Sequence, residues 1–208
     1  WQKNCLINSM KNHILKNIFF LIGFISLMSF SFVKDDFILW QENKKLKIQD
    51  FKADNKDTIK VNRQQFLGAI SAIRIEYSSF QRNKNSVPDF SIKTYFDPNE
   101  SWMLLKNDYV LQHEQIHFDL TELYARKMRK SVESLRQKNV TNISIYRKKI
   151  QRWNAMKEKA SNQFDADNQD YYIKIGQKIL FQKNPKQEAW KKKVDRELFQ
   201  YSLFKNAD

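Results

Sequence analysis

The segment His113-Glu114-Gln115-Ile116-His117 combines the residue types and the spacing that a hydrolytic zinc site requires. On an α-helix, positions four apart lie one turn apart on the same face, so the imidazoles of His113 and His117 can bind one ion. Glu114 falls beside that face, where its carboxylate can take a proton from metal-bound water. The segment therefore predicts a zinc metallopeptidase helix, with His113 and His117 as ligands and Glu114 as the general base.

The residues that follow on the same helical face are mostly apolar: Leu120, Tyr124, Met128 and Leu135. This periodicity directs the two histidines toward the core. Buried imidazoles need polar partners, because an unsatisfied polar group is costly to bury, and a shared cation meets that need. The alternative is a structural or fortuitous histidine pair.

The third zinc ligand has to come from outside this helix. A catalytic zinc ion usually has three protein ligands and one open position for water. Glu122 and Asp119 lie off the ligand face, and we expect Asp119 to orient a ligand imidazole instead. The remaining histidine, His13, and the sole cysteine, Cys5, both precede the expected mature chain.

An acidic cluster at residues 164–170 offers the missing carboxylate in an otherwise basic half of the chain. An antiparallel second helix would bring Asp165 or Asp170 beside the two histidines, and Glu158 is a weaker option. Aspartate is an acceptable zinc ligand. The predicted cofactor is thus Zn²⁺, with the choice between Asp165 and Asp170 left open.

The sequence resembles a bacterial domain-of-unknown-function family of predicted secreted zinc-dependent proteases with an HExxH motif. The matching features are His113–Asp119 (HEQIHFD), Leu120–Ala125, Trp40, Asp50-Phe51 and Ser101-Trp102. The family also tends to carry a Tyr-Asp-x-x-Thr-x-His-Gly segment, which corresponds here to residues 164–171. Asp165 is retained and the family's histidine falls at Asp170, so the resemblance implies one of these two as the third ligand.

The rest of the chain indicates a small, mainly antiparallel N-terminal sheet followed by long packed helices, an α+β and zincin-like domain. A turn is expected at residues 97–100, and Asp108 is the expected N-cap of the helix that carries the histidines. The expected strands are 37–40, 45–51, 67–77 and 90–96, and the expected helices are 108–137, 143–169 with an extension toward Gly176, and 187–204.

The N-terminus has the layout of a secretory signal. Residues 10–31 contain a positive start, an apolar run and small residues at a cleavage site, whereas residues 1–9 read as upstream or fragment sequence. Residues 32–208 would then form the single mature domain, exported to the periplasm or secreted by a bacterium, without stable membrane insertion after cleavage. The alternative is an uncleaved anchor.

The formal charge of +14 invites a nucleic-acid interpretation. The densest basic runs, 126–130 and 191–193, are more typical of solvated helix faces, and no nucleic-acid module accompanies them. We therefore expect no nucleic-acid partner, although attraction to anionic polymers is compatible with this charge.

The predicted reaction is peptide-bond hydrolysis on a peptide or protein substrate. The expected strand 90–96 is a candidate edge for pairing with an extended peptide, and Tyr171, Tyr172 or Arg126 are candidates to stabilise the oxyanion. The alternative function is a secreted, non-catalytic binding or scaffolding protein with a structural or vestigial metal site. Coordination by both Asp165 and Asp170 would close the site in that case.

Overall fold

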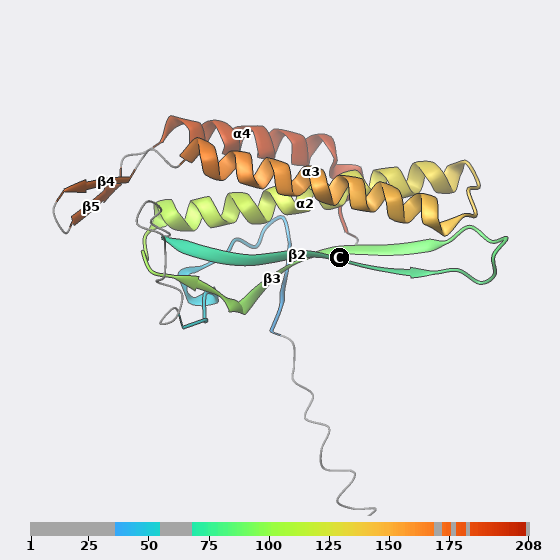
Figure 1. Cartoon of the computed structure of the whole chain (residues 1–208), viewed down its shortest axis with the longest axis horizontal. Helices are drawn as coiled ribbons and strands as arrows, with labels where there is room; N and C mark the ends of the chain where they lie inside the picture. Colours follow the sequence, from blue (N-terminus) through green and yellow to red (C-terminus); the bar gives the residue numbers. More distant parts are fainter. Residues whose placement is uncertain (1–35, 55–67, 169–171, 176–177, 182–183, 207–208) are drawn as a thin grey trace, which may run out of the picture. The chain divides into compact units, whose positions relative to one another are not determined.

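In the computed structural model of the chain, the residues around the two histidines form one long helix, as their helical periodicity predicts. This helix, α2, spans Asp108–Gln137 as expected (Figure 1). Its N-cap is Asn107 rather than Asp108, because the Asn107 side chain accepts a hydrogen bond from the Val110 amide. Two residues after its end, Asn139 adopts a left-handed conformation (φ 54°), as asparagine permits.

The structure describes residues 36–54, 68–168, 172–175, 178–181 and 184–206. The predicted signal segment, residues 10–31, and residues 1–9 lie outside this range. Residues 36–208 belong to one compact unit. The described part of the chain contains no helix that is long and apolar enough to cross a membrane.

A three-stranded antiparallel sheet in the order β1-β3-β2 precedes α2 in the sequence. Its strands are β1 (Ile38–Leu39), β2 (Ala69–Phe80) and β3 (Asp89–Met103). The turn expected at residues 97–100 does not end β3. Instead the β2–β3 register shifts between Ile70 and Ala72, so the turn-forming residues are absorbed as a bulge within the strand.

The strand expected at residues 45–51 is not formed. The segment contains the short 3-10 helix η1 (Ile48–Asp50), and the Asp50 carboxylate accepts a hydrogen bond from the Lys47 amide. The Leu46 amide donates to the Gln115 side chain on α2, 2.7 Å away. Local and side-chain hydrogen bonds therefore replace the strand ladder that the alternating sequence predicted.

The second half contains α3 (Ile143–Asn168) and α4 (Pro185–Gln200), which ends in η3 (Ser202–Phe204). The expected extension of the second helix toward Gly176 is wrong. Residues Tyr172–Ile175 (β4) and Lys178–Phe181 (β5) pair as an antiparallel hairpin. Their isoleucine and aromatic residues on either side of Gly176 were the sequence signal for this hairpin.

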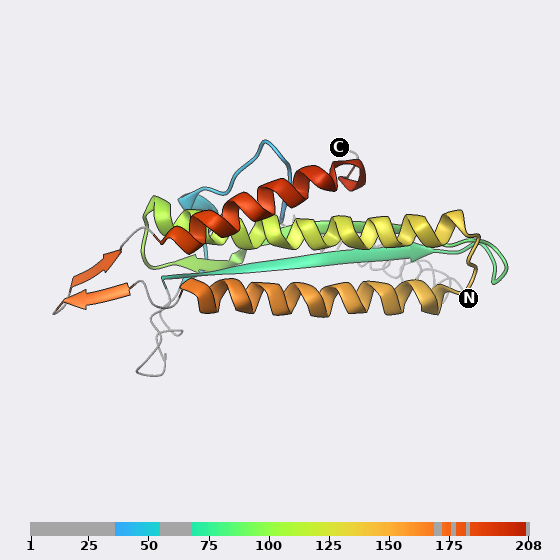
Figure 2. The ribbon, with the colours of Figure 1, turned by 90° about the horizontal axis from the view of Figure 1, so that it is seen from above.

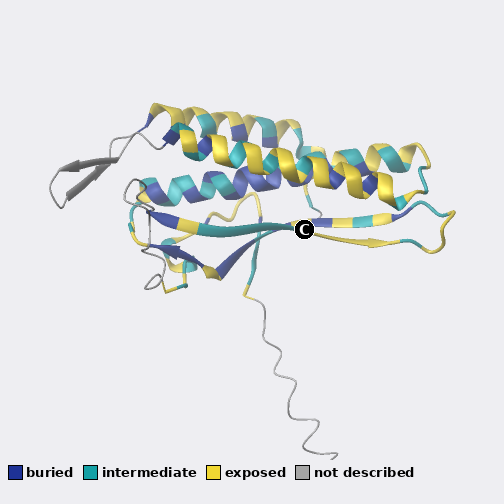
Figure 3. Cartoon of the chain, in the orientation of Figure 1, coloured by how far each residue is buried: buried dark blue, intermediate teal, exposed yellow. Residues whose placement is uncertain are grey.

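Helix α2 is the central element of the described unit. It lies between the sheet on one side and α3 and α4 on the other (Figures 1 and 2). Figure 3 shows that α2 is largely buried, whereas α3 and α4 expose one face each. The main core beneath the histidine-bearing half includes Phe96, Ile116, Leu120, Leu123 and Phe164. The α+β class is confirmed, and α2 is packed against other elements on both sides.

Candidate metal centre

Three of the predicted ligands meet between α2 and α3. His117 Nε2 lies 2.8 Å from Asp165 Oδ1 and 3.1 Å from His113 Nε2, and His113 Nε2 lies 3.2 Å from the same carboxylate oxygen. The three ligand atoms all lie within 4.8 Å of one another, the arrangement of a group that could hold a metal ion. The antiparallel return of α3 thus brings Asp165 to the two histidines.

The triangle formed by these atoms fits one face of a small coordination tetrahedron. Two ligand atoms that each stand about 2.0–2.1 Å from a tetrahedral ion are roughly 3.3 Å apart. The observed separations of 2.8–3.2 Å lie slightly below that value. Three electron-rich atoms facing one another also repel unless a cation or protons lie between them. The geometry is therefore that of a group that could hold a small metal ion.

Ser161 and Phe164, both from α3, hold the imidazoles in place. Ser161 Oγ lies 2.9 Å from His117 Nδ1, and a proton shared there leaves Nε2 free as a ligand. The fully buried ring of Phe164 stacks on His113 at 4.4 Å and meets His117 edge-on at 4.8 Å. Sequence reasoning missed both residues, although each lies within four positions of Asp165.

The charges at the site favour a cation. Burial alone would lower the pKa of His117, but the hydrogen bond with Asp165 and the negative charge of Glu114 outweigh it and raise this pKa. Burial would raise the pKa of Asp165, yet the hydrogen bonds with His113 and His117 hold it well below its usual range. Asp165 therefore stays charged, and protons compete with a metal for the imidazoles.

The cluster is open on one side. The side chains of His113 and His117 are 14% and 13% exposed, whereas that of Asp165 is 47% exposed. A ligand set of three residues with solvent access on the carboxylate side leaves room for water, which distinguishes it from a closed structural site.

Glu114 is buried next to this cluster, and its carboxylate accepts a hydrogen bond from the Ser71 hydroxyl of β2. Ser71 lies at the bulge, between the register positions of Ile70 and Ala72. Ser101 closes the bulge by accepting from the Ala72 amide and donating to the Asp97 carbonyl, at 2.9 and 2.5 Å. The bulge thus aims a hydroxyl at Glu114, a role typical of bulges beside functional sites.

Replacing Ser71 with alanine should destabilise the metal-free protein by about 1.5–3 kcal/mol, because a buried carboxylate loses a hydrogen-bond donor. Chemical denaturation measures this change. Ser71→Thr, which keeps the hydroxyl, is the matched control and should recover much of the loss. Equal stability of Ser71→Ala and the wild type would show that this hydrogen bond does not hold Glu114.

The structure places the other sequence candidates elsewhere. Asp119 does not orient an imidazole: it accepts hydrogen bonds from Trp40 Nε1 and Gln115 Nε2, each at 2.8 Å, on another face of α2. Glu158 is exposed beside Lys157, outside the cluster. Asp170 lies outside the described residues.

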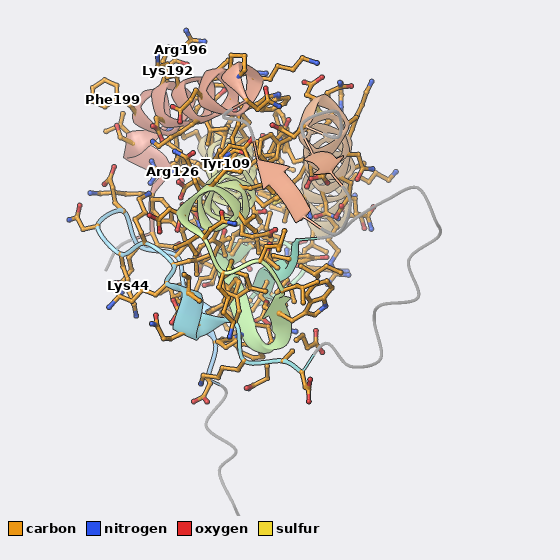
Figure 4. The ribbon with its side chains drawn as sticks, turned by 90° about the vertical axis from the view of Figure 1, so that its left-hand side faces the viewer. Lys44, Tyr109, Arg126, Lys192, Arg196 and Phe199 are labelled. Carbon is orange, nitrogen blue, oxygen red and sulfur yellow. The ribbon has the colours of Figure 1, made fainter. Side chains whose placement is uncertain are left out.

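The candidates for oxyanion stabilisation are not at the site either. Arg126, labelled in Figure 4, is fully buried and forms an ion pair with Glu122. The expectation of a solvated face is therefore wrong for the start of the run 126–130, whereas Lys130 at its end is exposed. Tyr171 and the side chain of Tyr172 lie outside the described part of the structure. Among the described residues, no side chain is therefore assigned to oxyanion stabilisation.

Comparison of the chain with protein-family models, with curated proteins and with solved structures finds no match. The resemblance to secreted zinc-dependent proteases therefore stays a prediction, and the function has to be argued from the site itself.

Proposed function

We propose that this protein is an exported, zincin-like, zinc-dependent metallopeptidase. The observation that carries the proposal is the convergence of His113, His117 and Asp165 next to the buried Glu114. Three ligands with an open side and a neighbouring carboxylate form the minimal constellation for metal-assisted hydrolysis. The proposed export rests on the signal-like residues 10–31.

His113, His117 and Asp165 would hold the ion. A bound zinc ion supplies a Lewis acid that lowers the pKa of its water to about 7 and polarises a carbonyl. Glu114 accepts the proton of the attacking water and delivers it to the leaving amine. Ser71 fixes the Glu114 carboxylate, and Ser161 and Phe164 fix the imidazoles, so these groups are oriented before substrate arrives.

The substrate would be an extended peptide. The prediction that residues 90–96 form an edge strand is wrong, because these residues belong to β3, which lies between β1 and β2. Among the described strands, β2 is the outer one on the side of Ser71 and Glu114. We therefore move the proposed peptide pairing to β2, whose free backbone groups can add one further strand.

Metal analysis of the purified full chain tests the ligand set. We expect about one zinc ion per chain in the wild type, and close to none in His117→Ala or Asp165→Ala, because two remaining ligands bind zinc weakly. Glu158→Ala removes an exposed carboxylate from the same helix and should leave the zinc content unchanged. Asp170→Ala tests the other candidate from the sequence.

The possible outcomes separate the candidate ligands. Zinc retained in Asp165→Ala but lost in Asp170→Ala would transfer the third ligand to Asp170. Unchanged zinc in His117→Ala would refute the site. A closed, four-ligand site without hydrolytic activity would favour a non-catalytic binding protein.

A further inference from the structure

The outer face of α4 combines cations with exposed apolar side chains, and the proposed active site uses neither. Lys192, Arg196 and Phe199 follow one another at spacings of four and three residues, so they share one face of the helix. Figure 4 shows all three on the outer side of α4, away from Arg126 on α2. Leu203 follows in η3. We call these four residues the α4 outer face.

The apolar residues of this face are exposed to an unusual degree. Phe199 is 79% exposed and Leu203 is 92% exposed. The inward side of α4 is already packed through Val194 and Leu198, which are buried in the main core. Exposure of Phe199 and Leu203 therefore does not follow from incomplete docking of α4.

The cations of the α4 outer face are available for a partner. Within the described residues, neither Lys192 nor Arg196 forms a salt bridge, whereas the neighbouring acids Asp195 and Glu197 are paired with Lys191 and Lys127. Among the described residues, α4 has one further acid, Glu188, which lies in the first turn of the helix and has no salt bridge there. The chain as a whole carries a formal charge of +14, so its long-range field also attracts anions.

We propose that the α4 outer face binds the surface of an anionic membrane. Lys192 and Arg196 match the negative headgroups, and Phe199 and Leu203 can enter the boundary between headgroups and acyl chains. In a single-stranded nucleic acid the phosphates would match the cations and a base could stack on Phe199, but the aliphatic side chain of Leu203 would gain no stacking partner. An anionic lipid surface accounts for all four residues.

Vesicle binding by the full chain tests this proposal. The probes are vesicles of phosphatidylcholine alone and vesicles containing roughly one third phosphatidylglycerol, an anionic surface. We expect tighter binding to the anionic vesicles, weakened about fivefold for each cation removed in Lys192→Gln and Arg196→Gln. The double variant Phe199→Ser/Leu203→Ser should weaken binding by about tenfold or more, because it removes the apolar insertion.

The controls remove equivalent groups from other surfaces. Lys148→Gln and Arg152→Gln take two exposed cations from α3, and Phe80→Ser removes the 68% exposed aromatic ring at the end of β2. All three should bind as the wild type does. Binding to neutral vesicles measures the apolar contributions alone: that of residues 18–28, which is the same in every variant, and that of Phe199 and Leu203, which only the double variant removes.

A second readout reports on α4 directly. Anionic vesicles should protect the Lys192 amine from acetylation, detected by mass spectrometry, while Lys148 remains reactive. Equal acetylation of both lysines, or variants of the α4 outer face that bind like the controls, would overturn the proposal.

A dimer that dissociates in Phe199→Ser/Leu203→Ser would assign this face to a second copy of the chain. Equally tight binding to single-stranded nucleic acid, weakened by the same cation variants but not by Leu203→Ser, would assign it to nucleic acid.

Discussion

The substitution Glu114→Gln should strongly reduce hydrolysis while leaving the zinc content unchanged. Glutamine has nearly the same shape as glutamate and can still accept the Ser71 hydrogen bond, but it cannot take a proton from water. A positioned general base contributes typically about 10²–10⁴-fold, so peptidase activity should fall by that factor. The ligands His113, His117 and Asp165 are untouched, and zinc should stay at the wild-type stoichiometry.

Cleavage of a mixture of unstructured peptides by the purified full chain, followed by mass spectrometry, measures this loss without a known substrate. Glu158→Gln is the control, because it neutralises an exposed carboxylate on α3 without approaching the cluster. A variant at Glu114 that cleaves as fast as the wild type would show that Glu114 is not the base. A wild type that binds zinc but cleaves none of the peptides would support the non-catalytic alternative.

The histidine-bearing helix could be predicted from the sequence, because a period of three to four residues over thirty positions is a strong local signal. The strand at 45–51 and the helical extension toward Gly176 were wrong for the opposite reason. Short segments are decided by side-chain partners such as Gln115 or by pairing with a second strand, and neither is visible in local periodicity.

Within the site, the sequence predicted the residue types but not their supports. His113 and His117 follow from helical spacing, and Asp165 from its place in an acidic cluster. Ser71 lies more than forty positions before Glu114 and reaches it only because a bulge re-aims its side chain. A hydroxyl in a strand carries no sequence signal for that role, so the contact had to come from the tertiary structure.

The basic run at residues 126–130 shows how charge patterning can mislead. Its first member, Arg126, is buried and donates to Glu122 Oε1 at 3.1 Å and to the Leu198 carbonyl at 2.7 Å. Arg129 also donates to Glu122, at 2.9 Å, and to the Phe204 carbonyl. These residues therefore join α2 to α4 and η3, instead of facing solvent.

Glu122 is the centre of this buried cluster. It is 1% exposed, and it accepts a further hydrogen bond from Thr94 on β3 at 2.8 Å. The single carboxylate thus balances two guanidinium groups and connects the sheet with the helices on the opposite side of α2. Its removal would leave two cations in or near the core without their counter-charge.

Glu122→Gln should therefore lower the free energy of unfolding by about 3–5 kcal/mol, the usual cost of breaking a buried ion pair from one side. The matched control is Asp195→Asn, which breaks an exposed pair with Lys191 at the same spacing of four residues and should cost at most about 1 kcal/mol. Denaturant unfolding of both metal-free variants compares the two values directly. If Glu122→Gln costs no more than Asp195→Asn, the buried cluster does not join the two sides of α2, and the apolar core alone must hold the histidine-bearing half of the helix in place.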